Sequence, residues 1–278
     1  MFQGRKLLIA TKHKKEKVIS PIIESELGVI SEINTLFDTD SLGTFSGEID
    51  RKDDVITTLK KKCLQAMDLH NVDLAIASEG SFGAHPSVFF LPGNEEFLIL
   101  IDFKNNLEIT ASELVTDTNF NAQFVSEKDE LLEFAKRVHF PSHGLILKSD
   151  KEKWEKIYKG ITNEDELIET FENLKQEFGK AYVETDMRAN YNPTRMNVIE
   201  KTTRKLVDKI KNKCPQCACP GFDVTSVKRG LACSQCNSAT QSILSLLYCC
   251  KKCNYSLEKM YPNNKKSEDP MYCDYCNP

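Results

Sequence analysis

The stretch Ala181–Met196 has the sequence AYVETDMRANYNPTRM and joins the two halves of the chain. Its first residues, Ala181–Glu184, predict a short strand, whereas Asn192 before Pro193 is typical of a helix start with asparagine as the cap. The residues between them are therefore expected to form a loop from the carboxyl end of a strand to the amino end of a helix. Open α/β sheets bind ligands at such ends.

This loop concentrates charged side chains. Its carboxylates, Glu184 and Asp186, are candidate catalytic groups, and its arginines, Arg188 and Arg195, are candidates for binding an anionic substrate. The alternative is that these carboxylates and arginines pair with one another and only fix the shape of the loop.

Composition limits the classes of function. The length of 278 residues suits one medium-sized domain with a small appendage, and 40% hydrophobic with 28% charged residues is ordinary for a globular protein. A net charge of -4 does not favour nucleic-acid binding. With no signal peptide and no run of 18 apolar residues, the sequence predicts a cytoplasmic protein without membrane association. In that reducing compartment, the 11 cysteines favour metal binding over disulfides.

The amino-terminal segment predicts a binding site for an anion. Lys6–Ala10 is expected to be a buried strand and Val18–Leu27 a helix, with the sequence TKHKKEK between them. A strand, a lysine-rich turn and a helix are a common arrangement for binding phosphate. The candidate residues for substrate binding are Thr11, Lys12, His13 and Lys15, and the alternative is a solvated lysine cluster.

Two further strand ends carry candidate residues. Val29–Phe37 predicts a strand that delivers Asp38 and Asp40 to a loop, where the two carboxylates can share a hard cation such as magnesium; ordinary acidic turn residues are the alternative. Val72–Ala77 predicts another strand, and the sequence SEGSFGAHP after it is expected to form a glycine-bearing loop. That loop offers a candidate catalytic carboxylate and two candidate substrate-binding groups, namely Glu79, Ser81 and His85.

The remaining periodicity predicts a mixed sheet flanked by helices. Apolar residues at helical spacing mark a helix that contains Cys63, which is expected to pack in the core. Further strands and helices are expected over Ser87–Leu91, Glu96–Phe103, Leu107–Leu114, Glu127–Val138 and a segment capped at Thr162 that ends near Phe178.

Four C-x-x-C turns near the carboxyl terminus predict two zinc ions. Two such turns complete one tetrahedral site of four thiolates, and a closed site of this kind is structural. The spacing favours two consecutive ribbons, although it is also compatible with a shifted pairing, and Cys219 and Cys249 are left over. The predicted ligands are Cys214, Cys217, Cys233, Cys236, Cys250, Cys253, Cys273 and Cys276.

The predicted architecture has three parts. An α/β body over residues 1–192 is followed by a connecting helix over 193–213 and a double zinc ribbon over 214–278. The ribbon has too little apolar sequence for its own core, so roughly 10 kcal/mol of zinc binding energy per site is expected to be folding energy. With two metal centres bound it is about neutral to slightly acidic, which does not favour nucleic-acid binding.

The ordered motifs IATKHKKEKVI, FDTDSLGTFSGEI, ASEGSFGAHP, FPSHGLIL, VETDMRANYNPTRM and CDYCNP resemble a family of uncharacterised, mostly bacterial proteins defined as a domain of unknown function. The chain is also distantly similar to the inosine triphosphate pyrophosphatase-like superfamily, whose first strand ends in Thr-x-Asn-x-x-Lys and whose later strands hold magnesium with acidic residues. Thr11 matches that turn, but His13 replaces the asparagine and Glu16 the lysine.

Two hypotheses of function follow from the sequence. The first is a magnesium-dependent hydrolase of a nucleotide or another phosphate ester, in which lysines and arginines hold the phosphate and carboxylates hold the metal. The second is a non-catalytic module that binds a ligand or a protein and uses the zinc ribbons as its interaction surface.

Overall fold

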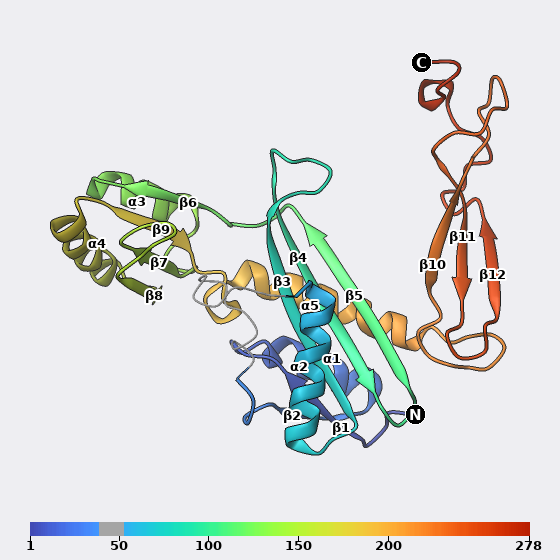
Figure 1. The fold of residues 1–278 in the computed structure, drawn as a ribbon, viewed down its shortest axis with the longest axis horizontal. Helices are drawn as coiled ribbons and strands as arrows, with labels where there is room; N and C mark the ends of the chain where they lie inside the picture. Colours follow the sequence, from blue (N-terminus) through green and yellow to red (C-terminus); the bar gives the residue numbers. More distant parts are fainter. Residues whose placement is uncertain (39–52) are drawn as a thin grey trace. The chain divides into compact units, whose positions relative to one another are not determined.

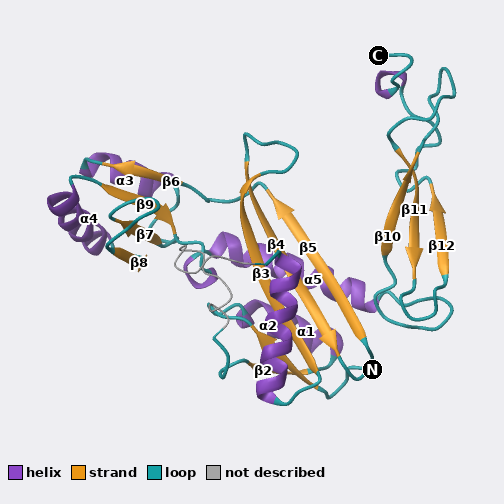
Figure 2. Ribbon diagram, in the orientation of Figure 1, coloured by secondary structure: helices purple, strands orange, loops and turns teal. Residues whose placement is uncertain are grey.

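The chain divides into two units, residues 1–207 and residues 208–278. A computed structural model describes residues 1–38 and 53–278, and Figures 1 and 2 show the elements. Sheets of five and four strands lie in the first unit, and a sheet of three strands lies in the second. A mixed α/β fold with helices against its sheets is thus confirmed for the first unit.

The five-stranded sheet has the order β2-β1-β3-β4-β5. The first three strands are parallel because α1 (Glu16–Leu27) and α2 (Val55–His70) serve as crossovers between them. The others form an antiparallel meander. The strands are β1 (Lys6–Ala10), β2 (Ile30–Ile33), β3 (Leu74–Ala84), β4 (Pro92–Asp102) and β5 (Leu107–Val115).

Helices cover both faces of this sheet. Figure 1 shows α2 in front of the strands, with α1 and the long helix α5 (Pro193–Lys211) behind them. The apolar side of α2, which includes Leu59 and Cys63, packs on alternate strand residues such as Ala75 and Ala77. The predicted core position of Cys63 is confirmed.

The four-stranded sheet has the order β6-β9-β7-β8, is wholly antiparallel and has its own apolar core. Phe134 from one helix and Phe171 from the other are both fully buried in that core. The elements are β6 (Ala122–Val125), α3 (Lys128–Arg137), β7 (Leu145–Lys148), β8 (Ile157–Ile161), α4 (Glu164–Phe178), β9 (Ala181–Thr185) and the short 3-10 helix η2 (Ala189–Tyr191).

Four local predictions are wrong. The expected loop after residue 77 is a continuation of β3, because β4 pairs with it residue by residue as far as Ala84, and Gly80 lies inside this strand. Ser87–Leu91 is the connection between β3 and β4 instead of a strand, and β2 is shorter than predicted. The cap of α4 is Asn163, whose side chain accepts a hydrogen bond from the backbone of Glu166, instead of Thr162.

The second unit is an antiparallel meander with little buried apolar surface. Its strands are β10 (Val224–Arg229), β11 (Ile243–Cys249) and β12 (Ser256–Met260), and the 3-10 helix η3 (Pro270–Tyr272) lies near the chain end. Every residue of β12 is exposed, as are most residues of β10. The cysteine turns lie at the two ends of these strands.

Candidate functional site

The carboxyl end of β1 lies beside the middle of β3, at the switch point of the five-stranded sheet. From β1 the chain crosses to β2 on one side and later returns to β3 on the other, and the last residue of β1 lies next to Ala77 inside β3. Ala10 pairs with Ala77, which places the next residues, Thr11 and Ser78, side by side. Crevices at such switch points are the usual ligand sites of open α/β sheets.

Lys15 lies at this switch point and is buried. It precedes α1, and its Nζ donates to Ser78 Oγ at 3.0 Å and to the Ser78 carbonyl at 3.4 Å. No carboxylate forms an ion pair with Lys15 within residues 1–38 and 53–278. Burial, followed by repulsion from Arg195, lowers the pKa of Lys15 to about 7.

Thr11 adds an unused hydroxyl to the same place. Its side chain is buried, and its Oγ1 has no hydrogen-bond partner among the residues that the structure describes. Buried polar atoms in folded proteins are nearly always paired, so an orphaned hydroxyl marks a position where water or a ligand completes the site. His13 and Lys14, which follow, both have positive φ and turn the chain sharply into α1.

Two buried ion pairs flank Lys15. On the α2 face, Lys62 donates to Glu79 at 2.5 Å, with side-chain exposures of 8% and 5%. On the opposite face, Arg195 from α5 donates to Glu96 of β4 at 2.6 Å, and both side chains are fully buried. Each pair is neutral as a whole, so neither provides a separate carboxylate for the positive charge of Lys15, and no other described residue does so.

Gly80 allows the second pair to lie against the backbone of β3. A Cβ atom there would lie 2.5 Å from Glu96 Oε1 and 2.6 Å from Arg195 Nη2, which is closer than non-bonded atoms approach. The absence of a side chain at this position is therefore a requirement of packing, not of backbone conformation, since the φ of Gly80 is not positive.

A cavity of about 320 Å³ adjoins this pair, and much of its lining is aromatic. The rings of Phe82 and Phe120 lie 5.7 Å apart, and the guanidinium of Arg195 lies 5.1 Å from the centre of the Phe82 ring. The cavity is lined by Gly80, Ser81, Phe82, Phe120, Ala122, Ile146, Tyr182, Glu184, Thr185 and Met187. Aromatic side chains of this kind stack on the flat rings of ligands.

Glu184 supplies the acidic group of this cavity. Its Oε1 accepts from Lys148 Nζ at 2.8 Å, but burial dominates and raises the pKa of the carboxyl. Lys148 in turn lies 4.4 Å from the centre of the Trp154 ring. Glu184 is therefore placed at the aromatic cavity and not beside Lys15.

One part of the loop after β9 fixes the shape of the loop itself, and the other part contributes a side chain to the site. The fully buried Asp186 accepts from Arg188 at 2.5 Å, so these two residues pair with each other, which was the structural alternative for this loop. Asn192 caps α5 by accepting from the Arg195 backbone at 2.9 Å, as predicted. The same helix start carries the Arg195 side chain back to Glu96 and to the carbonyl of Met187.

Other predicted residues lie apart from Lys15 or outside the described chain. Asp38 forms an ion pair with Lys12, whereas Asp40 lies outside the described residues. His85 accepts hydrogen bonds from two backbone groups of its own turn at 3.2 and 3.1 Å. The sequence-based prediction missed Lys62, Ser78 and Glu96. The only signal for the two charged residues is periodicity, because helical spacing puts Lys62 in line with Leu59 and Ala66, and alternation puts Glu96 in line with Leu98.

The eight predicted cysteines form two sets of four, but the pairing differs from the favoured one. Cys214 and Cys217 join Cys250 and Cys253, while the other set is Cys233, Cys236, Cys273 and Cys276. The closest sulfur pairs are 3.6 to 3.8 Å apart. Tetrahedral zinc with Zn–S bonds of ~2.3 Å requires about 3.8 Å between sulfurs, so both sets fit zinc.

The meander explains this crossed pairing. Because β10, β11 and β12 alternate in direction, the first and third turns lie at one end of the strands and the second and fourth at the other. Each turn closes with a backbone bond from the residue after its second cysteine, as from Asn237 to Cys233 at 3.0 Å and from Asn254 to Cys250 at 2.9 Å. Asn237 and Asn254 have positive φ, which asparagine tolerates well.

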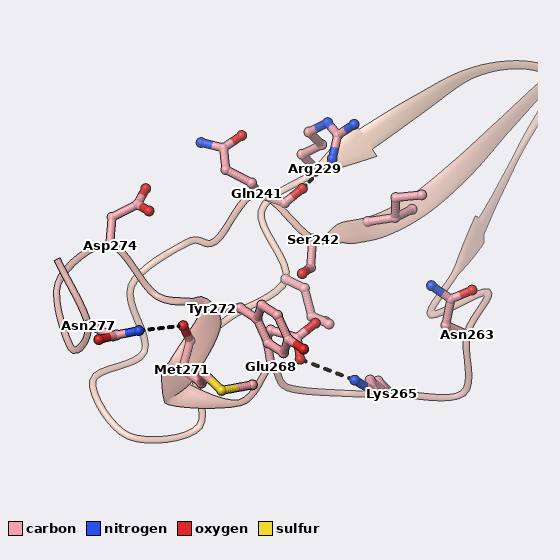
Figure 3. Close-up of a pocket in the computed structure, with 12 residues that line it drawn as sticks. Arg229, Gln241, Ser242, Asn263, Lys265, Glu268, Met271, Tyr272, Asp274 and Asn277 are labelled. Atoms are coloured by element: carbon pink, nitrogen blue, oxygen red, sulfur yellow. Dashed lines mark hydrogen bonds and ion pairs between the residues drawn. The ribbon is translucent and has the colours of Figure 1, made fainter. Parts of the chain in front are cut away.

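A second cavity, of about 550 Å³, lies in the second unit (Figure 3). Lys265 donates to Glu268 at 3.2 Å across it, and hydrogen bonds, above all from Ser242, lower the pKa of Glu268 to about 2. Met271 and Tyr272 on its wall are 60% and 59% exposed. Its lining contains two cations and two carboxylates, Arg229, Lys265, Glu268 and Asp274, and is neutral as a whole.

Comparisons with known proteins place the chain in a family. No helix among the described residues is long and apolar enough to cross a membrane. No curated protein matches the sequence. A family model described as "Domain of unknown function (DUF6671)" matches residues 62–278, which include Lys62, Glu79, Glu96, Arg195 and all eight cysteines of the two sets. The chain belongs to this family of proteins with a domain of unknown function.

Proposed function

We propose that the first unit hydrolyses a phosphate ester whose organic part contains a flat ring, as in a nucleotide. The observation that carries this proposal is a buried lysine at the switch point of the sheet, next to a buried hydroxyl, where the described part of the chain gives the lysine no carboxylate partner and the hydroxyl no hydrogen bond. A phosphate group supplies both the missing negative charge and the missing hydrogen-bond acceptors. Lys15 and Thr11 bind it, and the amino end of α1 adds a favourable dipole.

In this proposal the aromatic cavity binds the flat ring of the substrate. It shares Gly80 and Phe82 with the surroundings of Arg195, so it lies close to the charged groups. Its volume is at the lower end of the range of ~300–1,000 Å³ typical of ligand pockets. Phe82 and Phe120 stack on the ring, and the carboxyl of Glu184 accepts or donates a hydrogen bond at its edge.

The carboxylate next to the phosphate site is Glu79. In the proposal Glu79 accepts the proton of the attacking water, and its ion pair with Lys62 at 2.5 Å holds the carboxylate in place. Magnesium does not fit the described residues, because Asp38 and Glu79 are both paired with lysines. The described carboxylates also form no group of three that shares one ion. We derive no step through magnesium.

Substitution of Glu79 tests this role. Glu79→Gln is expected to lower turnover by ~10² or more, because the base is lost while the shape is nearly kept. The measurement is release of phosphate from nucleoside triphosphates and simple phosphate esters, with and without added magnesium or manganese. Glu108→Gln, which changes an exposed carboxylate on β5, is the control and should leave turnover unchanged.

The alternative is that the second unit binds a protein partner. The cavity of Figure 3 favours this reading, because exposed Met271 and Tyr272 lie beside charges that cancel. Aromatic residues and methionine are enriched at protein interfaces, where a neutral lining avoids unpaired charge. If no phosphate ester is hydrolysed by the unsubstituted protein, the hydrolase proposal fails. A selected peptide whose binding is lost in Tyr272→Ala and kept in Tyr275→Ala would then support the alternative.

A further inference from the structure

The environment of Lys15 is unusual because both carboxylates that act on it already form ion pairs with other residues. The groups that act on it are Glu79 from β3, Glu96 from β4, Lys62 from α2 and Arg195 from α5. These four form two complete ion pairs. Within residues 1–38 and 53–278, the amine donates hydrogen bonds only to the neutral oxygens of Ser78.

Protonated Lys15 would thus be a buried cation without a counter-ion. Burying such a charge costs far more than burying the neutral amine, which explains why the pKa falls from 10.5 to about 7. When an anion enters, it becomes the counter-ion and reverses this balance, and a dianion does so more strongly than a monoanion.

We propose that Lys15 takes up a proton from solvent when a tetrahedral dianion binds, which makes the site selective for phosphate monoesters over singly charged phosphate diesters. The amine nitrogen provides the lone pair, and the solvent buffer provides the proton. Lys15 is therefore a specificity-determining residue as well as an anchor. The inference deepens the proposed function, on which it rests for the identity of the ligand.

The sign of the pH dependence follows directly. Above pH 7 the empty site is mostly unprotonated, and binding must include proton uptake, so affinity falls as pH rises. At pH 8 about nine-tenths of Lys15 is neutral, given its value of about 7. Each mole of ligand bound at that pH should therefore draw up to ~0.9 mole of protons, and the affinity should approach a tenfold loss per further pH unit.

Isothermal titration calorimetry with sulfate tests this inference on the full-length protein. Sulfate is a tetrahedral dianion that does not titrate near pH 8, so any proton uptake belongs to the protein. Titrations in Tris and in HEPES, whose ionisation enthalpies differ, give the number of protons. We expect ~0.5 to 0.9 proton per sulfate, and at least tenfold weaker binding of methanesulfonate, which has a single charge.

Three variants separate the role of Lys15 from a general effect of charge. Lys15→Arg should bind sulfate without proton uptake, because arginine stays charged. Lys15→Met, an apolar chain of similar length that suits a buried position, should lose at least tenfold in affinity. Lys14→Arg, a neighbouring change in the same turn, should behave as the unsubstituted protein does.

Sulfate binding without proton uptake would overturn the inference, and so would unchanged uptake in Lys15→Arg or unchanged affinity in Lys15→Met. Failure of the unsubstituted protein to bind either sulfate or methyl phosphate would overturn it together with the proposed phosphate site. Proton-coupled binding in a protein that hydrolyses no ester would uphold the inference and remove only the hydrolase.

Discussion

Removal of metal from the two cysteine sets is expected to unfold residues 208–278 and to leave residues 1–207 folded. Strands β10 and β12 of the second unit are largely exposed and β11 is mostly half-buried, so the apolar burial that opposes unfolding is small. Zinc bound by four thiolates contributes roughly 10 kcal/mol or more of apparent binding energy, which in such a module is folding energy. Elemental analysis should find two zinc ions per chain, and hydrogen exchange after chelation should show loss of protection only in the second unit.

Cys233→Ser distinguishes the crossed pairing from consecutive ribbons. In the crossed arrangement this substitution opens the set that contains Cys273 and Cys276, so these thiols should become reactive to alkylation while Cys250 and Cys253 stay protected. Consecutive pairing would instead expose Cys214 and Cys217. Cys249→Ser, which changes a cysteine outside both sets, is the control and should retain both zinc ions.

Arg195→Met is expected to destabilise the first unit by about 3–5 kcal/mol, because it leaves Glu96 as an unpaired carboxylate in a fully buried position. The loss should be visible as a lower urea midpoint. The double variant Arg195→Met with Glu96→Met should recover much of it, since no buried charge then remains.

The matched control for this substitution is Arg204→Met. Arg204 also lies on α5 and forms an ion pair with Glu200 at 2.8 Å, but both side chains are exposed, so the expected loss is under about 1 kcal/mol. Equal losses for the two arginine substitutions would show that the buried pair contributes no more than a surface pair.

Several features could be predicted from short stretches of sequence, because residues next to one another in the chain determine them. Asn192 before Pro193 marked the start of α5, and the C-x-x-C turns marked all eight cysteines of the two sets. Each of these signals lies within a few residues of sequence.

The missed features depend on residues that are distant in sequence. The crossed cysteine sets follow from the alternating direction of three strands, which the spacing between turns does not encode. β3 continues through Gly80 because β4 and the Arg195–Glu96 pair lie against it, 16 and more residues away along the chain. The charged residues around Lys15 likewise come from four separate elements, α2, β3, β4 and α5.

The most direct test of the central claim is a crystal structure of the protein with tungstate, a tetrahedral dianion with a strong anomalous signal. The claim is that the carboxyl end of β1 and the adjacent part of β3 around Ser78 form a phosphate site around Lys15. It predicts an anomalous peak within hydrogen-bonding reach of Lys15 Nζ and Thr11 Oγ1. Tungstate bound elsewhere, with none beside Lys15, would contradict the claim.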